Sequence, residues 1–426
     1  MSAPQDSAPE AGSVPRRRLF QGAVGGAAAG ALAVGGAWAV EGSRSSGMSD
    51  PADKDAIDLT TQYPLYDQAE PAGIRTPPQR YAIFMTFDMS AGTVATDLQS
   101  LLARWTAASA QLMAAQPIGQ VQPTSDMAVG RDTGEALGLD AASLTVTIGL
   151  GPGLFDTRFG LAGKRPALLT PLPALPSDNL SAGTSGGDLS VQVCSDDPQV
   201  CYHAVRNLAR MARDTVQTRW TVMGFGRASA GQGQQTPRNL LGFKDGTRNI
   251  SEAADFATYV WLRDAGWMTG GTYQVVRKIE MNIETWDADR VSDQEKIFGR
   301  GKSAGEPLTG NKEFDTPQFA AQGKDGKPVI APTSHIALAA HENNGGVKIL
   351  RRSYNYTDGI NEFGQLDAGL LFISYQNNPA HFVQLQRKLG AGDLLNEYIK
   401  HVGSGLFAIP PAPKAGHYIG EQLFAR

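Results

Sequence analysis

Three tracts in the second half of the chain carry side chains that can do chemistry, and the first is an acid held between glycines. Residues 242–246 read Gly-Phe-Lys-Asp-Gly, so Asp245 lies where glycines permit a tight backbone turn. A carboxylate in such a place can accept and return a proton if its surroundings adjust its pKa. The same pattern fits an aspartate that only caps a turn, so the tract by itself leaves both interpretations open.

The other two tracts supply a histidine and a pair of arginines. His335 lies in residues 334–339 and is one of six histidines that could ligate a metal or simply pack in the core. His341 is the nearest alternative ligand and reads better as a loop histidine. Arg351 and Arg352 are consecutive in an apolar tract. Because side chains alternate along a strand, only one of them can face a pocket.

In this order the three tracts resemble the dye-decolourising peroxidase family, whose haem enzymes consist of two ferredoxin-like units. Residues 242–246 match the family's GxxDG motif, residues 334–339 resemble its haem-ligand segment, and residues 349–356 resemble its distal-arginine strand. One such match would be weak, whereas three in the right order are specific. The chain is therefore identified as a member of this family, of the exported bacterial type with a twin-arginine signal.

The resemblance covers roughly residues 78 to 412. Further similar stretches are residues 261–273, 369–376 and 395–399. The chain departs from the family pattern at Ala337, where an arginine is common, and at Ile250, where a proline is usual. The first departure weakens the transfer of any role for a basic group there, and neither affects the three tracts.

The resemblance implies one haem b in each chain, with His335 as the iron ligand. Covalent attachment is not expected, because the chain has no Cys-x-x-Cys-His tract. Asp245 is implied to move the proton during peroxide cleavage, and Arg351, rather than Arg352, to stabilise the developing negative charge. The implied activity is a haem peroxidase in which hydrogen peroxide acts through a ferryl intermediate to oxidise dyes, phenolics or other one-electron donors.

Supporting roles follow from the same resemblance. Leu371 and Phe372 are expected to cover the distal face of the haem, although ordinary core packing would explain them equally well. An acid is expected to bind the second ring nitrogen of His335, which would make the ligand more basic. Asp393 and Glu397 are the candidates, and the sequence does not choose between them.

Other assignments rest on position alone. Thr247, Arg248 and Asn249 are expected to contact the haem propionates because they follow Asp245 in the chain. Bulky donors could not enter a narrow pocket and would pass electrons through an aromatic side chain. Four residues could act as such relays or be purely structural, and Tyr398 is favoured for surface access. They are Tyr354, Tyr356, Trp267 and Tyr398.

The elements that must position these residues form two α+β units. The first shows the order βαββαβ, which is typical of a ferredoxin-like unit with helices on one face of an antiparallel sheet. Its strands are predicted at residues 80–87, 144–150, 189–194 and 219–225, and its helices at 93–115 and 200–213. The second unit has predicted strands at 271–279, 346–350 and 369–375, and helices at 287–298 and 379–389. The predicted fold class is α+β, with tandem ferredoxin-like units of the dimeric α/β-barrel kind.

These patterns also give domain boundaries. We predict a signal peptide at 1–39, a flexible leader at 40–77, an N-terminal domain at 78–227, a linker with the GxxDG motif at 228–270 and a haem-binding domain at 271–426. The irregular stretch 299–333 is long for a compact domain, so it is expected to have a functional role or to be poorly ordered.

The N-terminal segment resembles a twin-arginine export signal. Arg17 and Arg18 precede Leu19-Phe20 and a weakly hydrophobic run, and residues 37–39 have the small-x-small form of a cleavage site. We therefore expect an extracellular or cell-envelope protein with no membrane anchor once the signal is removed. An ordinary secretory signal and an uncleaved anchor are the alternatives.

Composition excludes several classes of protein. Of the 426 residues 41% are apolar, which is enough for a large core and excludes a wholly disordered chain. The net charge of −4 offers no basic surface for nucleic acid. Two cysteines cannot build a disulfide scaffold, and Cys194 and Cys201 could form one bridge, remain as thiols or, in principle, ligate haem.

The expected partners are hydrogen peroxide and a reducing substrate, and the sequence defines neither the physiological donor nor the oligomeric state. Two other functions stay open at this point. One is a haem-handling or iron-release protein of an iron-uptake system, which the family resemblance also suggests. The other is a secreted ferredoxin-like binding module without haem.

Overall fold

Antiparallel strands organise the chain into two sheets, one of four strands and one of five, that join at both edges into one nine-stranded sheet. The computed structural model describes residues 57–226 and 236–425. The predicted signal peptide at 1–39, the first part of the predicted leader and the start of the predicted linker, residues 228–235, lie outside the described residues. The part described here belongs to one compact unit, Pro51–Arg426.

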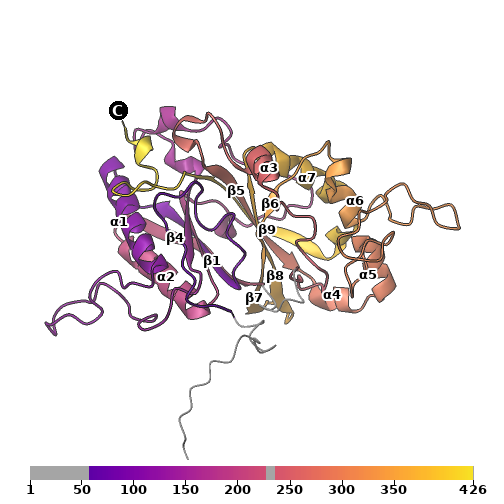
Figure 1. Cartoon of the computed structure of the whole chain (residues 1–426), viewed down its shortest axis with the longest axis horizontal. Coiled ribbons are helices and arrows are strands. Elements are labelled where there is room, and N and C mark those ends of the chain that lie inside the picture. Colours follow the sequence, from indigo (N-terminus) through magenta and orange to yellow (C-terminus); the bar gives the residue numbers. More distant parts are fainter. Residues whose placement is uncertain (1–56, 227–235, 426) are drawn as a thin grey trace, which may run out of the picture. The chain divides into compact units, whose positions relative to one another are not determined.

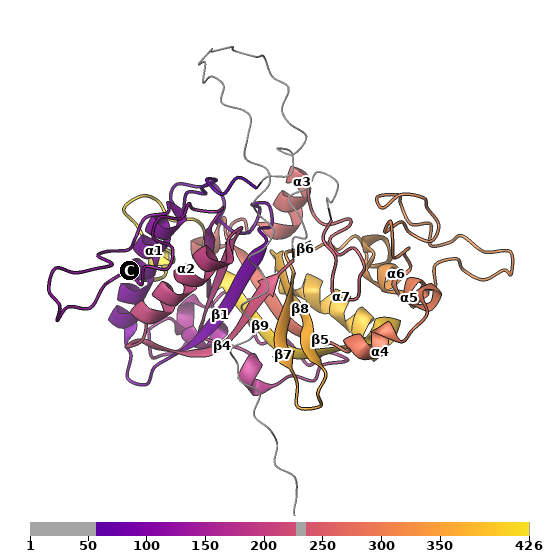
Figure 2. The same ribbon diagram turned by 90° about the horizontal axis from the view of Figure 1, so that it is seen from below.

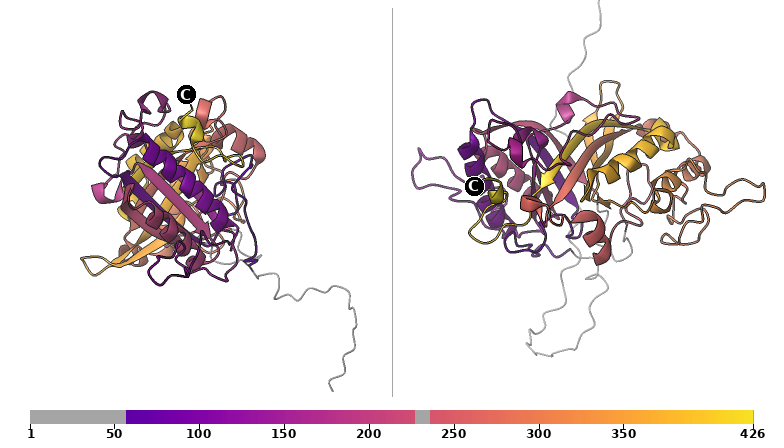
Figure 3. Two further views of the ribbon diagram at one scale, coloured as in Figure 1. Left: turned by 90° about the vertical axis from the view of Figure 1, so that its left-hand side faces the viewer. Right: turned by 90° about the horizontal axis from the view of Figure 1, so that it is seen from above.

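The first sheet has the strand order β2-β3-β1-β4, which is the order of a ferredoxin-like unit. Its elements are β1 (Tyr81–Met89), α1 (Ala95–Met113), β2 (Thr145–Leu150), β3 (Leu189–Ser195), α2 (Pro198–Met211) and β4 (Val216–Phe225). The helix α2 begins as its sequence suggests, because the Asp197 carboxylate accepts from the backbone N–H groups of Gln199 and Val200 and Pro198 occupies the first turn. The helices α1 and α2 lie side by side over this sheet (Figures 1 and 3).

The second sheet repeats the same order as β9-β5-β8-β7. Its strands are β5 (Thr272–Met281), β6 (Leu350–Arg351), β7 (Tyr354–Ile360), β8 (Leu366–Gln376) and β9 (Ile399–Ile409). The helices around it are α3 (Ala253–Asp255), α4 (Ile283–Asp287), α5 (Val291–Phe298), α6 (His335–Ala339) and α7 (Pro379–Gly392). The longest of them, α7, packs against β5 and β8 (Figure 2).

The two sheets close into a ring. The strand β2 pairs with β9 at Leu150 and Ala408, and β4 pairs with β7 at Gly224 and Phe225. Apolar side chains from both sheets fill the interior, where the rings of Phe84 and Phe407 lie 6.0 Å apart. The predicted fold class, α+β with tandem ferredoxin-like units, is confirmed. Because the interior is packed, a ligand site must lie outside the ring.

Several elements differ from the sequence prediction, which also did not include β7, α3 and α6. The strand predicted at 346–350 is only Leu350–Arg351, because the left-handed Gly345 and Gly346 continue a turn up to it. The helix predicted at 287–298 begins only at Val291 as α5, because Arg290 is extended, and a separate helix, α4, ends at Asp287. The final strand, β9, was not predicted, because its glycines and polar residues hide the strand pattern.

Two segments outside the predicted domains contribute to the packed structure. Residues 57–77, assigned above to a flexible leader, place Leu65, Ala72 and Ile74 in the core. In the predicted linker, Phe256 and Val260 are buried within a π-helical turn. Cys194 and Cys201 are buried free thiols without a bridge. Among the described residues, no helix is long and apolar enough to cross a membrane.

Candidate functional site

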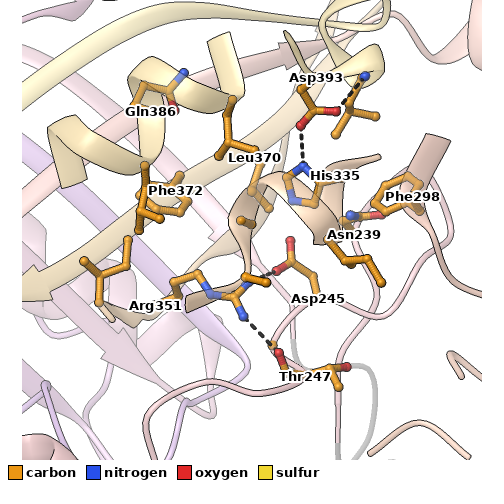
Figure 4. A pocket seen from close by; sticks show the side chains of 18 of the residues that line it. Asn239, Asp245, Thr247, Phe298, His335, Arg351, Leu370, Phe372, Gln386 and Asp393 are labelled. Atoms are coloured by element: carbon orange, nitrogen blue, oxygen red, sulfur yellow. Dashed lines mark hydrogen bonds and ion pairs between the residues drawn. The ribbon is translucent and has the colours of Figure 1, made fainter. Parts of the chain in front are cut away.

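Most of the predicted site residues come together in a cavity outside the second sheet (Figure 4). One wall consists of Leu370 and Phe372 on β8 with Phe382 and Leu385 on α7. The other walls carry polar groups from α6, from the GxxDG tract and from the ends of β6 and α7. These lining residues are Asp245, Thr247, Arg248, His335, Arg351 and Asp393.

His335 is the first residue of α6, and a carboxylate fixes its orientation. Its Nδ1 lies 2.6 Å from Asp393 Oδ2, while Asp393 Oδ1 accepts from the Leu395 N–H at 2.9 Å. With Nδ1 bound to a carboxylate, the other ring nitrogen is the basic one, and it points into the cavity (Figure 4). Asp393 is therefore the acidic partner of His335, a choice between Asp393 and Glu397 that the sequence left open. Glu397 is exposed.

Burial and the Asp393 carboxylate shift the pKa of His335 in opposite directions. Burial lowers the pKa of His335, but the adjacent Asp393 carboxylate, through its charge and its hydrogen bond, outweighs burial and raises the pKa above its usual value. A carboxylate behind an imidazole makes that imidazole a stronger ligand for a metal. The arrangement is that of a metal-ligating histidine with its supporting acid.

Asp245 and Arg351 form an ion pair on the facing side of the cavity. Arg351 Nη1 donates to Asp245 Oδ1 at 3.1 Å, and Nη2 donates to the Thr247 carbonyl at 3.1 Å. The two side chains are 23% and 29% exposed, so both are still reached by water. The guanidinium contact uses Asp245 Oδ1 and leaves Oδ2 outside the ion pair.

The tract that carries Asp245 is a tight hairpin. The Asp245 N–H donates to the Pro237 carbonyl at 2.8 Å, and the Asn239 N–H donates to the Phe243 carbonyl at 3.0 Å. Gly246 has a φ of +132°, which glycine adopts far more readily than other residues. The glycines of the GxxDG motif therefore shape the backbone that presents the acid.

Asn249 and Leu371 have places other than those expected. Asn249 does not line the cavity. Its side-chain amide donates to the Arg351 carbonyl at 2.7 Å and accepts from the Arg351 N–H at 2.9 Å, so it holds the backbone of Arg351. Leu371 belongs to the cluster inside the ring. The expectation for Leu371 needs correction because side chains alternate along β8, so Leu370 and Phe372 face the cavity.

Cationic groups gather along the same cavity. Arg248 pairs with Glu342, and Arg300, which the sequence did not single out, is 6% exposed and donates to the carbonyls of Gly305 and Glu313. Burial, reinforced by the charges of Arg248 and Arg351, lowers the pKa of Arg300 to about 10. A set of cations this close together favours an anionic group on the ligand. No motif in the irregular stretch 299–333 signals Arg300.

One of the predicted relays is connected to the site through packed rings. The ring centroids of His335 and Phe298 are 5.8 Å apart, those of Phe298 and Trp286 are 5.7 Å apart, and those of Trp286 and Tyr398 are 4.9 Å apart. The Tyr398 hydroxyl donates to the Asp289 carboxylate. Tyr398 is only 6% exposed, so it lies just under the surface, less accessible than the sequence suggested.

The other three relay candidates make structural contacts. Tyr354 and Tyr356 are buried, and the Lys278 ammonium lies 4.6 Å from the Tyr356 ring centroid. Trp267 stacks on Phe155 at 5.9 Å. None of these three lines the cavity.

The residues present fit a haem group. A single imidazole backed by a carboxylate faces an acid and an arginine, apolar side chains line the space, and cations lie at its edge. Within residues 57–226 and 236–425, no cluster of three or more His, Cys, Asp or Glu side chains could hold a bare metal ion.

Comparison with known proteins defines the class. The N-terminal domain description of the Dyp-type peroxidases matches residues 71–226 and the C-terminal one matches residues 236–414. Together they cover most of the chain, and the chain belongs to the Dyp-type peroxidase family. The resemblance found in the sequence is confirmed, as is the assignment as a peroxidase.

Individual relatives agree over nearly the full length. The chain is 36% identical to a deferrochelatase of Yersinia pseudotuberculosis, with 97% of this chain and 96% of the relative covered, and 36% identical to one of Escherichia coli O157:H7, with 96% of each covered. A Dyp-type peroxidase of Streptomyces coelicolor is 36% identical with a TM-score of 0.81, and the match covers 86% of this chain and 98% of that one. Ferric DtpA from Streptomyces lividans has the same identity and coverage and a TM-score of 0.80.

Proposed function

We propose that this peroxidase binds haem non-covalently between His335 and the Asp245–Arg351 pair, and uses hydrogen peroxide to oxidise dyes, phenolics or other one-electron donors. The observation that carries the proposal is the pairing of His335 with Asp393 on one side of a cavity whose facing side holds an acid and an arginine. When bound, haem supplies the redox-active iron, and His335 ligates it. Arg248 and Arg300, cations that line the same cavity, are proposed to bind the propionates.

The chain's own groups handle the proton and the charge. Asp245 Oδ2 takes the proton from one oxygen of hydrogen peroxide and gives it to the other, which leaves as water. The Arg351 guanidinium stabilises the negative charge that develops on the departing oxygen. Asn249 holds the Arg351 backbone, and Phe372 and Leu370 limit what enters beside peroxide.

This proposal is tested by haem content and by the rate of reaction with peroxide. The parent protein should show a Soret band and oxidise an anthraquinone dye, whereas His335→Ala should lose haem. Asp245→Asn should keep haem but react with peroxide about 10²- to 10⁴-fold more slowly, the range typical of a lost general base. Asp325→Asn, an exposed acid elsewhere, is the control. Full haem content in His335→Ala would exclude it as the ligand.

Bulky donors are proposed to be oxidised at Tyr398. Haem oxidised by peroxide would supply the oxidant, so the Tyr398 phenol would give up one electron along Trp286 and Phe298 while its proton moves to Asp289. A donor molecule then returns one electron, and Asp289 returns the proton. Tyr398→Phe should therefore lower dye oxidation while the reaction with peroxide keeps its rate. Tyr202→Phe, 52% exposed on α2, is the matched control. Equal dye oxidation in both variants would reject Tyr398.

Export by the twin-arginine pathway is proposed from the sequence of residues 16–39. An exported peroxidase of this kind would act outside the cell or in the cell envelope. Replacing Arg17 and Arg18 by lysine should keep the protein in the cytoplasm, which cell fractionation measures. Unchanged export of that variant would argue for another route.

A second candidate function is haem handling, because curated relatives that match nearly the full length carry the name deferrochelatase. Removal of iron would leave a metal-free porphyrin, which fluoresces where haem does not. Incubation with haem in the absence of peroxide distinguishes the two functions. Porphyrin fluorescence would favour iron release, and its absence together with peroxide-dependent dye oxidation would favour the peroxidase.

A further inference from the structure

The irregular stretch 299–333, which the function described above does not explain, places one buried acid against the hairpin that carries Asp245. This acid, Glu313, is 9% exposed. The stretch runs outward beyond α5 and α6 at the edge of the fold (Figure 1). Arg300, at its start, donates to the Glu313 carbonyl at 2.9 Å and so fixes the backbone at this position.

The Glu313 carboxylate bridges the two strands of the hairpin. Oε1 accepts from the hydroxyl of Thr236 on the first strand and, at 2.9 Å, from the hydroxyl of Thr247 on the second. Oε2 pairs with the Lys244 ammonium. These contacts lie on both sides of Asp245, which is itself tied to the first strand only through its N–H.

The charge of Glu313 is well matched to these donors. Burial alone would raise the pKa of Glu313, but hydrogen bonds from Lys244, Thr236 and Thr247 outweigh burial and lower it. The ionised carboxylate therefore satisfies three donors and neutralises a lysine next to the acid of the site. It also stabilises the position of Thr247, whose carbonyl accepts from Arg351.

We propose that Glu313 is a positioning residue for the peroxide reaction. By binding both strands of the hairpin, it holds Asp245 and Arg351 in the geometry that this reaction needs. This inference rests on the proposed function. It gives the stretch 299–333 a function, which is to hold the hairpin that forms one wall of the cavity. Displacement of a reacting group by about 1 Å can lower a rate about 100-fold, so Glu313 can affect the rate of the peroxide reaction without contacting the substrate.

The first test uses the haem-free protein and measures hydrogen exchange. In Glu313→Ala, the amides of Asp245 and Asn239, which are bonded within the hairpin, should exchange faster, while amides in β5 and β8 keep their protection. Glu313→Gln retains an oxygen for the two threonines but loses the lysine pair, so it should fall between the parent and Glu313→Ala. Glu362→Gln, an exposed acid on the β7–β8 hairpin, is the control.

The second test separates the peroxide step from the donor step. Per bound haem, Glu313→Ala should react with peroxide about 10- to 100-fold more slowly, with the later reduction by the donor unchanged. A merely structural role would lower haem-bound protein and leave both rates alone. Parent-like exchange at Asp245 together with a parent-like peroxide rate would overturn the proposal.

The two tests also separate this inference from the proposed function. If the parent protein does not react with peroxide, the proposed function is wrong, and the exchange measurement alone decides whether Glu313 holds the hairpin. If Glu313→Ala fails to fold, Glu313→Gln decides in its place. Faster exchange and a slower peroxide reaction in Glu313→Gln would support the positioning role of Glu313, and parent-like values for both would overturn it.

Discussion

At the scale of single residues, the site depends on how side chains are held as much as on which side chains are present. His335 is oriented by Asp393, and Arg351 is held through its backbone by Asn249 and through its side chain by Thr247. Asp245 then receives one guanidinium bond and keeps an oxygen for the proton. Each reactive group thus has a partner whose removal should have its own signature.

Replacing Asp393 by asparagine keeps the shape of the side chain but removes its charge. The imidazole would lose the carboxylate that makes it a strong ligand, so haem affinity should fall about 10- to 100-fold, the range seen for lost supporting acids at metal sites. Titration of haem into haem-free protein, followed by the Soret band, measures this effect. Glu397→Gln is the matched control, since Glu397 is exposed and does not contact His335. A parallel loss in both variants would contradict the specific role of Asp393.

The sequence predicted these residues unevenly, for identifiable reasons. Asp245, His335 and Arg351 stand in tracts that resemble a family and could be located directly. Asp393 and Glu397 differ by four positions on a short helical stretch, and only the fold shows that Asp393 is buried against the histidine. Leu371 and Phe372 were both expected to face the haem, but consecutive residues of a strand face opposite sides, so Phe372 lines the cavity and Leu371 packs inside the ring.

At the scale of elements, the hairpin 236–247 and the strand pair β6 and β8 set the spacing of the site. The hairpin depends on its contacts with Glu313. The two-residue strand β6 depends on its pairing with Tyr375 and Ser374 of β8. The sequence indicates most of the longer strands and helices, because their apolar spacing is regular, but it does not indicate β9, whose glycines and polar residues hide the pattern. Arg300 and Glu313 lie in the stretch 299–333, where no period exists, so no pattern could indicate them.

The hairpin gives a prediction about backbone conformation. Gly246 has a φ of +132° and only Thr236 and Pro237 side-chain atoms near its missing Cβ, at 3.5 and 3.9 Å, so Gly246→Ala would fit sterically but strain the backbone by about 1–3 kcal/mol. Relief of this strain should displace Asp245 and slow the peroxide reaction. Gly326→Ala, with a φ of +76° in open space, should destabilise the fold by about 1 kcal/mol without slowing the reaction. Stopped-flow kinetics with thermal unfolding would check both, and equal rates in the two variants would refute the link.

At the scale of the whole molecule, the two sheets are joined by few hydrogen-bonded pairs, and their closure could not be read from the sequence. The resemblance predicted two ferredoxin-like units, but the pairings of β2 with β9 and of β4 with β7 involve residues more than one hundred positions apart. A local pattern carries no information about such contacts. Closure matters for function because it fills the ring and leaves the outer face of the second sheet for the cavity.

His401 on β9 is 4% exposed, and its ring lies 3.1 Å from the Gln386 amide on α7, so its protonation is linked to folding. Burial, aided by the charge of Arg277, lowers the pKa of His401 to about 3, whereas an unfolded histidine has a pKa near 6.5. Between these values the unfolded chain binds a proton that the folded chain does not, so stability falls as the pH decreases below about 6.5. From pH 6.5 to 5, where carboxylates contribute little, this histidine should lower the free energy of unfolding by roughly 1.5–2 kcal/mol. Urea unfolding of the haem-free protein at both pH values measures the difference.

Replacing the ring distinguishes this titration from loss of a contact. His401→Gln should remove most of the pH dependence, whatever its effect on stability at pH 7. Gln386→Met removes the side chain that lies 3.1 Å from the His401 ring nitrogen but leaves the histidine, so the pH dependence should persist. His381, whose pKa burial also lowers, contributes in the same direction and accounts for a smaller residual slope. If His401→Gln kept the parent's full loss of stability from pH 6.5 to 5, His401 could not be its source, and the proton would have to bind elsewhere in the unfolded chain.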